Sequence, residues 1–193
     1  MTEKKYDAVV FGASAGGLQV IRSLVMSLPV NFSMSLIIVQ HLSDSSTGGW
    51  IDLLSRASQV PVKEADEKEV IRPGTVYVAP PNYHLLVERD YTFTLTVDER
   101  VNYARPAIDV TFVSASDAYK DRLIGVVATG ANFDGAEGLR YIKDMGGVAI
   151  VQDPKTAEVE AMPKAAIERA KPHLIMPMDG IIKYLIEVHS NNL

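Results

Sequence analysis

The chain alternates between two hydrophobic patterns, which predict strands and helices in turn. Continuous apolar runs of strand length lie at residues 6–11, 35–40, 123–129 and 148–152. Stretches with apolar residues at helical spacing lie at residues 18–28, 50–57, 108–119, 136–145, 163–170 and 181–188. A strand followed by a helix, repeated along a chain, is typical of a parallel sheet with helices on both faces. We therefore predict an α/β fold with a doubly wound, mostly parallel sheet.

The sequence changes in character between residues 61 and 96, where β-branched and aromatic residues become frequent. Turn-forming residues stand at Arg72-Pro73-Gly74 and at Glu88-Arg89-Asp90. Short strands are predicted at residues 76–79, 85–87 and 91–97. The last two should pair as a hairpin, which makes this region a small antiparallel β insertion. Because no repeat, low-complexity segment or linker interrupts the chain, we predict a single domain over residues 1–193.

The composition of the chain argues against several classes of protein function. The 193 residues carry a formal net charge of −5, which argues against a dedicated nucleic-acid binder because such proteins present a basic surface. There is no cysteine, so disulfides, thiolate metal sites and thiol catalysis are excluded. No acidic or histidine pair has the spacing of a metal site, and no metal or organic cofactor is implied. Neither a signal peptide nor an apolar run near the ~20 residues of a membrane helix is evident, so a cytoplasmic protein is expected.

A glycine-rich turn at residues 12–17 separates the first predicted strand from the first predicted helix. With Ser14 at its centre, it matches G-x-S-x-G, the turn that presents the nucleophile of many serine hydrolases. The start of the following helix offers unpaired N–H groups that favour an oxyanion. A similar turn also cradles phosphate in nucleotide-binding proteins. A dinucleotide site, however, needs an acidic residue after the second strand, and this chain has Gln40-His41 there.

Three polar residues follow predicted parallel strands, at the edge where open α/β sheets bind their ligands. Ser14 follows the first strand, His41 follows the second, and Asp134 lies in the turn after residues 123–129. They suit a nucleophile, a general base and an acid that orients the base. Each also has a simpler structural role, as a helix cap, a strand-end residue or a turn residue. Their shared place at one edge of the sheet favours the catalytic interpretation.

The other histidines give weaker signals. His84 lies in the antiparallel insertion, near the predicted sheet edge, and is a candidate contact at the rim of the site. A plain surface position is the simpler interpretation of His84. His173 and His189 lie near the ends of predicted helices, where a cation suits the helix dipole.

These segments together resemble the catalytic domain of the CheB family, the chemotaxis receptor protein-glutamate methylesterases. The similarity runs from about Tyr6 to Val188 and rests on the order and spacing of several motifs. The motifs lie at residues 12–17, 39–41, 77–84, 105–109, 129–136 and 162–163. The serine-histidine-aspartate order also differs from that of α/β-hydrolases, in which the acid precedes the histidine.

The resemblance implies a serine esterase that hydrolyses glutamate γ-methyl esters on chemoreceptors and that can also deamidate glutamine. Ser14 would be the nucleophile, His41 the base and Asp134 the orienting acid, and the reaction would pass through an acyl-enzyme. No metal or cofactor takes part in such a reaction.

The resemblance also places the oxyanion against backbone N–H groups of Ala15, Gly16 and Ala131, with His84 and Asn132 at the substrate rim. The chain departs from the family pattern at two of these turns. Ala15 stands where the family usually has threonine, and Ala131-Asn132 replaces a usual Met-Gly pair. Both changes concern the oxyanion geometry and the rate rather than the fold.

The partner implied by the resemblance is a methylated chemoreceptor, through which alone the protein would approach a membrane. Family members usually carry an N-terminal phospho-receiver, whereas this chain begins its first strand at about Tyr6. We therefore expect no receiver domain and an open cleft, with either constitutive activity or regulation by a partner in trans. Two other classes remain open: a catalytically weak module that binds a receptor or signalling partner, and a nucleotide or phosphate site at the glycine-rich turn.

Overall fold

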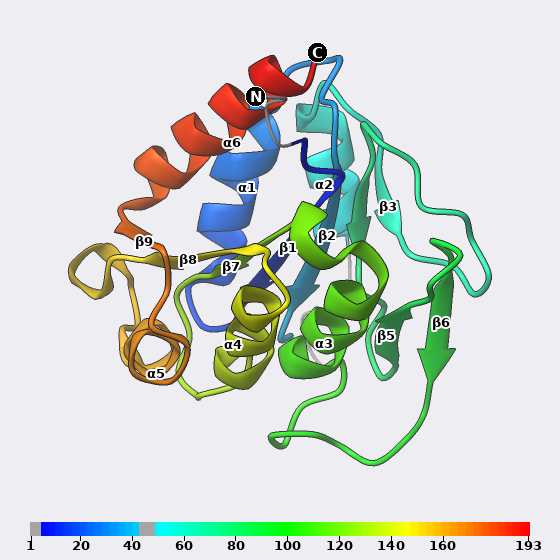
Figure 1. Cartoon of the computed structure of the whole chain (residues 1–193). Coiled ribbons are helices and arrows are strands. Elements are labelled where there is room, and N and C mark those ends of the chain that lie inside the picture. The colour runs from blue at the N-terminus through cyan, green and yellow to red at the C-terminus, as the bar shows by residue number, and fades with distance from the viewer. Residues whose placement is uncertain (1–4, 43–48) are drawn as a thin grey trace.

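The computed structural model describes residues 5–42 and 49–193, which form a central sheet with helices on both sides (Figure 1). The strands of the main sheet are β1 (Ala8–Ala13), β2 (Ser35–Gln40), β3 (Val62–Glu64), β4 (Val76–Val78), β7 (Leu123–Val127), β8 (Val148–Gln152) and β9 (Leu174–Met176). The helices are α1 (Gly17–Ser27), α2 (Trp50–Ala57), α3 (Ile108–Tyr119), α4 (Ala136–Asp144), α5 (Ala161–Ala170) and α6 (Met178–Asn192).

All strands of the main sheet run parallel, in the order β3-β4-β2-β1-β7-β8-β9. The chain starts at the centre with β1, builds outward through β2 and β4, and then returns to the other side of β1 with β7. The strand order therefore reverses beside β1, and crevices at such reversals are the usual ligand sites of open α/β sheets. Ser14, His41 and Asp134 follow the three adjacent strands β1, β2 and β7.

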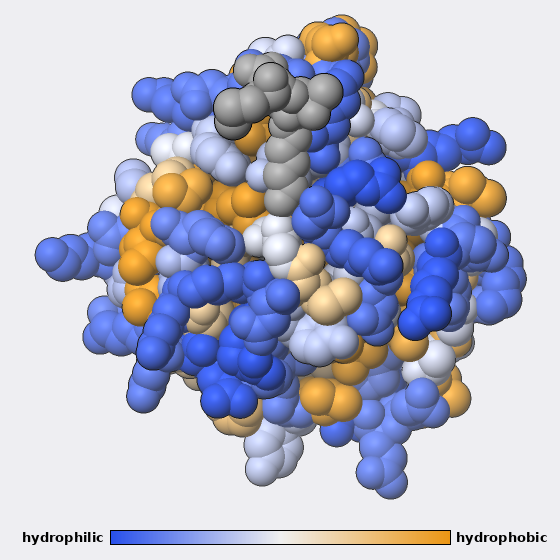
Figure 2. All heavy atoms as spheres, viewed as in Figure 1, coloured by the Kyte–Doolittle hydropathy of each residue, from blue (hydrophilic) through white to orange (hydrophobic). Residues whose placement is uncertain are grey.

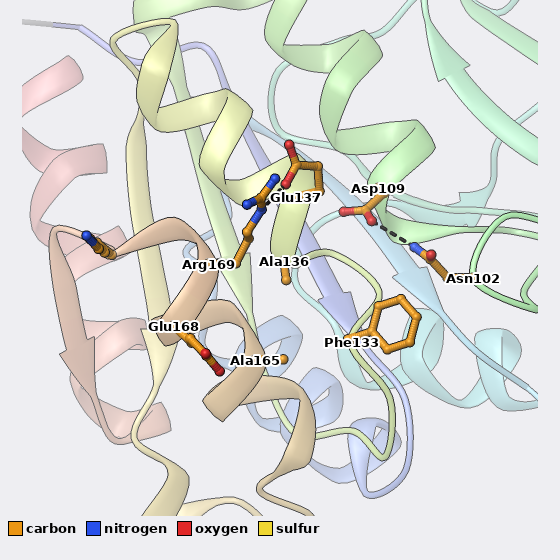
Figure 3. Close-up of a pocket in the computed structure, with 9 residues that line it drawn as sticks. Asn102, Asp109, Phe133, Ala136, Glu137, Ala165, Glu168 and Arg169 are labelled. Atoms are coloured by element: carbon orange, nitrogen blue, oxygen red, sulfur yellow. Dashed lines mark hydrogen bonds and ion pairs between the residues drawn. The ribbon is translucent and has the colours of Figure 1, made fainter.

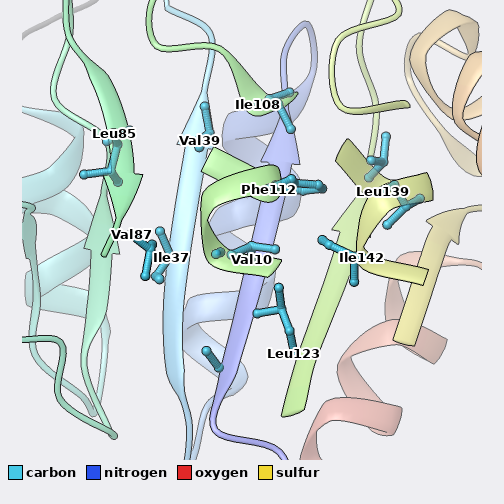
Figure 4. Packing of buried hydrophobic residues seen from close by; sticks show 14 of the residues in the cluster. Val10, Ile37, Val39, Leu85, Val87, Ile108, Phe112, Leu123, Leu139 and Ile142 are labelled. Carbon is cyan, nitrogen blue, oxygen red and sulfur yellow. The ribbon is translucent and has the colours of Figure 1, made fainter. Parts of the chain in front are cut away.

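Two hydrophobic clusters hold the layers together. Alternate residues of a strand face opposite sides of a sheet, so Val9 and Phe11 pack with α1, α2 and α6, while Val10 faces the other helices. On that second face Phe112 of α3 and Ile142 of α4 pack against the strands (Figure 4). Gly125 in β7 lets α4 approach closely, because a β-carbon there would lie 2.5 Å from Ile142 Cδ1.

A short antiparallel hairpin lies beside α3, apart from the main sheet. Its strands are β5 (His84–Val87) and β6 (Phe93–Thr96), paired with His84 opposite Thr96. Leu85, Val87 and Phe93 are buried in the same cluster as Ile108 and Phe112. The hairpin thereby extends the core beyond the main sheet, and it leads into the segment before α3 that borders the site.

The doubly wound parallel sheet with a small antiparallel insertion is confirmed, with two differences in detail. The strand predicted at 76–79 belongs to the parallel sheet as β4, where it pairs with β2 and β3. Two edge strands, β3 and β9, were not predicted from the sequence. Each has only three residues. The residues of β9 are apolar, but a run of three is too short to predict a strand from its hydrophobic pattern.

Tyr6 and Asn192, which are near the two ends of the described chain, lie side by side. Tyr6 N donates to Asn192 Oδ1 at 3.2 Å, and Asn192 Nδ2 donates to Tyr6 O at 2.6 Å. Polar side chains cover most of the face shown in Figure 2, where the apolar patches are scattered. Within residues 5–42 and 49–193, no helix is long and apolar enough to cross a membrane.

Candidate active site

Ser14 lies in the turn between β1 and α1, where hydrogen bonds of its backbone fix its position. Ser14 N donates to Thr129 O at 3.0 Å, and Ser14 O accepts from Gly17 N at 2.9 Å. Gly16 has a φ of 77°, in the left-handed region that glycine adopts without strain, so the chain can reverse directly into α1. The turn leaves the Ser14 side chain half-buried at the wall of a cleft.

His41 follows β2 and lies beside Ser14, and the Gln40 side chain donates hydrogen bonds to the backbone of both residues. The side-chain amide Nε2 of Gln40 donates to Ser14 O at 2.9 Å and to His41 O at 2.7 Å. Its Oε1 lies against Gly17, where an added β-carbon would come within 1.9 Å of it. Gln40 is only 4% exposed, so it is a structural brace between the predicted nucleophile and the predicted base. No pattern in the sequence indicates this role for Gln40, which was considered as evidence against a dinucleotide site and as part of the motif at residues 39–41.

Asp134 is fully buried and binds the ring of His41. Its Oδ2 lies 2.9 Å from His41 Nε2 and accepts from Ile108 N at 2.6 Å. Its Oδ1 accepts from Asp109 N at 3.1 Å and from Asn102 Nδ2 at 2.9 Å. Burial alone would raise the pKa of Asp134, but the bonds from His41, Asn102 and Ile108 outweigh it and hold the pKa below its usual value. The carboxylate is therefore ionised at neutral pH.

Asn102 is a further residue of this network that the sequence analysis did not find. Its Nδ2 donates both to Asp134 Oδ1 and, at 2.8 Å, to Asp109 Oδ2. Burial raises the pKa of Asp109, and the neighbouring Asp134 carboxylate adds to this effect. Asn102 has a φ of 52°, a left-handed conformation that asparagine tolerates better than most residues. An asparagine before a helix start is a weak signal, which explains why it was missed.

The second ring nitrogen of His41 faces the cleft. Because the Asp134 carboxylate only accepts, the hydrogen of the neutral ring is assigned to Nε2 and Nδ1 keeps its lone pair. Asn132 Nδ2 lies 3.4 Å from Nδ1, a long hydrogen bond, while Asn132 Oδ1 accepts from Asp134 N at 3.1 Å. Among the residues described, no hydrogen bond joins Ser14 Oγ to His41. Ser14, His41 and Asn132 nevertheless line one cleft of about 320 Å³.

The predicted oxyanion donors belong to two turns that a single side chain connects. Ala15 and Gly16 line a shallow hollow together with Ser14 and His41. Thr129 Oγ1 donates to Ala15 O at 2.8 Å, which fixes the turn after β1 against the turn after β7. Ala131 is exposed on the latter turn. Backbone N–H groups of Ala15, Gly16 and Ala131 as oxyanion donors stay a prediction, which this arrangement accommodates.

His84 does not line the cleft, and its predicted place at the substrate rim or on the surface is wrong. It is 2% exposed, and its Nε2 donates to Glu99 O at 2.9 Å. Its Nδ1 accepts from Ala107 N at 3.2 Å. The ring is buried because it satisfies two backbone groups of the segment that leads to α3. Asn132, the other predicted rim residue, does line the cleft.

A second hollow of about 630 Å³ adjoins the cleft, and Asn102 lines both (Figure 3). Phe133 lines this second hollow, while its neighbours Asn132 and Asp134 bind His41. Bonds from Arg140 and Arg169 lower the pKa of Glu137, at the border of this hollow, to about 2. No group of three or more potential metal ligands lies together in the described part of the chain.

Comparison with known proteins identifies the family to which this site belongs. Residues 9–185 match the family model described as CheB methylesterase. The chain belongs to the CheB methylesterase family. A solved CheB methylesterase catalytic domain from Thermotoga maritima superposes with a TM-score of 0.90 at 34% identity, covering 96% of this chain and all of that one.

Individual CheB proteins are also similar to this chain in sequence. A Leptospira interrogans protein is 48% identical over 97% of both chains, and its name assigns it provisionally as a protein-glutamate methylesterase/protein-glutamine glutaminase. A Clostridium acetobutylicum protein with that name is 37% identical over 94% of this chain and 53% of its own length. This chain therefore matches one CheB relative almost end to end and another over about half of its length.

Proposed function

We propose that this chain hydrolyses glutamate γ-methyl esters of chemoreceptors and deamidates glutamine side chains. The names of its relatives support the two activities, since they read protein-glutamate methylesterase/protein-glutamine glutaminase. The observation that carries the proposal is the hydrogen bond from His41 Nε2 to the buried Asp134 carboxylate, in the cleft that also contains Ser14. A carboxylate that fixes one ring nitrogen leaves the other free to accept a proton.

In the proposed mechanism, Ser14 Oγ attacks the ester carbonyl while His41 Nδ1 accepts its proton. The protonated ring then gives that proton to the leaving oxygen, and methanol departs from an acyl-serine. A water molecule attacks the acyl carbon, His41 accepts one of its protons, and that proton returns to Ser14 as the glutamate is released. With a glutamine substrate, ammonia leaves in place of methanol. Asp134 stays ionised throughout and stabilises the charged ring.

A phosphate site at the same glycine-rich turn is the less favoured alternative. The start of α1 would have to hold the anion, but the Glu158 side chain lies against it. A β-carbon on Gly16 would come within 2.8 Å of Glu158 Oε2. A carboxylate at this position already occupies the positive end of the helix and would repel a phosphate. The geometry therefore favours ester chemistry over nucleotide binding.

The test is methanol release from a methylated receptor by the wild-type chain and by Ser14→Ala. We expect the substitution to reduce release to background. Because no hydrogen bond of Ser14 Oγ is present among the described residues, the free energy of unfolding should change by no more than about 0.5 kcal/mol. Ser27→Ala, which removes an exposed hydroxyl of α1, is the matched control and should retain the rate. A Ser14→Ala variant that turns over like the wild type would remove Ser14 from the mechanism. A wild type that binds receptor but releases no methanol would favour a pure binding module.

A further inference from the structure

Two arginines line the cleft around Ser14 and His41, although the chain as a whole is acidic. The chain has 24 acidic against 19 basic residues, yet among the described residues the lining of this cleft includes Arg100 and Arg105 and no aspartate or glutamate. Asp134 lies beneath this surface with 0% exposure, and His41 and backbone N–H groups surround its charge. Two guanidinium groups therefore line this cleft, while the exposed Glu158 lines the neighbouring shallow hollow together with Gly16.

Neither arginine is neutralised by a carboxylate within the described residues. Arg105 Nη1 donates to the backbone oxygens of Val97 and Asp98, at 2.8 and 2.9 Å, which orients the side chain without cancelling its charge. Arg100 is exposed and makes no ion pair with the preceding Asp98 or Glu99. By contrast, Arg122, Arg140 and Arg169 each form ion pairs elsewhere on the surface. Within residues 5–42 and 49–193, the two arginines of the cleft lining therefore have no carboxylate partner.

The segment that carries both arginines is fixed to the site. His84 Nε2 donates to Glu99 O on one side of Arg100, and Asn102 Nδ2 donates to Asp134 on the other. Anchors on both sides limit the movement of Arg100 relative to His41. A cation on a pre-organised segment loses less entropy on binding than one on a free loop.

A glutamyl ester on a protein must bring its own backbone close to these arginines. Its reacting carbonyl carbon is only three bonds from Cα, so the substrate chain has to lie across the mouth of the cleft. If the ester is on a helix, side chains three and four residues away lie ~5–6 Å from it, on the same face. Those neighbours are then placed against Arg100 and against Tyr103, which is 88% exposed at the same cleft.

We propose that Arg100, with Arg105 beside it, selects protein substrates whose ester is flanked by carboxylates on the same helical face. This inference rests on the proposed esterase function and adds the chemical class of sequence that the cleft favours. Acidic neighbours are attracted to the two guanidinium groups, and basic neighbours are repelled, so discrimination has both an attractive and a repulsive part. Exposed ion pairs contribute about 0.2–1 kcal/mol, which corresponds to a preference of roughly 1.4- to 5-fold per pair.

The experiment uses two helical peptides with one glutamate γ-methyl ester each. In the first peptide the residues three and four positions to either side are glutamate, and in the second they are alanine, which the proposed glutaminase activity cannot convert to glutamate. The wild-type chain should hydrolyse the acidic peptide about two- to fivefold more efficiently, through a lower KM, and added salt should remove the preference. Arg100→Gln should lose the preference by raising KM for the acidic peptide, with kcat unchanged. Arg100→Lys should restore part of the preference, because it keeps the charge.

Arg89→Gln is the matched control, since it removes the same charge from the turn of the hairpin, away from the cleft lining. It should keep the wild-type preference. Equal kcat/KM for the two peptides with the wild type, or a preference that Arg100→Gln retains, would overturn the inference while leaving the esterase function intact. A wild type that hydrolyses neither peptide, nor a methylated receptor, would instead contradict the proposed function itself.

Discussion

Asp134 accepts hydrogen bonds from the first turn of the helix that contains Asp109, and Asp109 accepts one from the first turn of the helix that follows Asp134. Asp134, which precedes α4, accepts from Ile108 N and Asp109 N in the first turn of α3. Asp109, in α3, accepts from Gly138 N in the first turn of α4 at 2.6 Å. Each carboxylate thereby satisfies N–H groups that a helix start leaves unpaired. The bonds that connect α3 to α4 therefore also position the carboxylate that binds His41.

This relationship predicts different outcomes for the two aspartates. Asp134→Asn should lower kcat by about 10⁴-fold, because an amide cannot fix the ring tautomer and stabilise its charged form as a carboxylate does. It should also lower the free energy of unfolding by roughly 1–3 kcal/mol, since one set of buried N–H donors loses its acceptor. Initial rates of methanol release and urea unfolding measure the two effects.

Asp109→Asn is the comparison for that prediction. Asp109 does not contact His41, and its substitution should lower kcat far less than Asp134→Asn while still disturbing the contact between α3 and α4. Equal losses of kcat for the two variants would mean that helix docking, rather than the bond to His41, explains the effect.

A second prediction concerns the hydrogen bonds from the Gln40 side chain to the backbone oxygens of Ser14 and His41. Gln40→Glu replaces the Nε2 donor with an oxygen that faces two carbonyl oxygens, those of Ser14 and His41. We expect a lower kcat and a loss of about 1–3 kcal/mol of stability, because two hydrogen bonds become repulsive contacts. Gln59→Glu, an exposed change of the same chemistry, should leave both unchanged. A Gln40→Glu variant with wild-type kcat would show that the relative position of Ser14 and His41 does not depend on this amide.

The sequence predicts a common position for the three candidate residues because each follows a strand with a strong apolar run. Strands β1, β2 and β7 are buried along their whole length, so the hydrophobic pattern predicts them well. The adjacency of these strands is a long-range property that the pattern does not contain. The structure added it, and with it the bond between His41 and Asp134.

The residues that sequence reasoning missed lie where no periodic pattern exists. Asn102 belongs to the irregular segment between β6 and α3, and its role depends on two carboxylates that come from elsewhere in the chain. His84 was misplaced for a related reason. A histidine at the start of a short strand has no apolar signature of burial, and only the folded segment around Glu99 and Ala107 explains why it is inside.

The burial of His84 leads to a third prediction. His84→Phe keeps an aromatic ring but leaves Glu99 O and Ala107 N without partners, at a cost of about 1–3 kcal/mol. The segment with Arg100 and Asn102 should become less ordered, so KM for receptor should rise as well. Thermal unfolding and hydrogen exchange of residues 99–107 measure these changes. Unchanged exchange in that segment would show that other contacts hold it.

Tyr119 provides a test of stability at alkaline pH. Burial raises the pKa of this hydroxyl from 10.0 to about 12, so the folded chain keeps the proton at pH values where the unfolded chain loses it. Below pH 10 this hydroxyl is protonated in both states and does not change the free energy of unfolding. As the pH rises from 10 towards 12, the free energy of unfolding falls by on the order of 2 kcal/mol. In Tyr119→Phe this part of the decline should be absent when urea unfolding is followed from pH 9 to 12. Tyr103→Phe, at an exposed position, should decline like the wild type, and an unaltered slope in Tyr119→Phe would refute the assignment.

The paired hydrogen bonds between Tyr6 and Asn192 have a practical consequence for experiments with this chain. They bring both ends of the described chain to the side of the sheet where β1 begins. Ser14 and His41 lie on the opposite side, after the carboxyl ends of the strands. A surface tether or fluorescent label attached at either end would therefore leave the cleft facing outward. Because the ends are so close, a short peptide could join them, and new ends could be opened in an exposed turn such as that of the hairpin. A circularly permuted chain of this kind would keep the three loops of the site in their present order around the sheet.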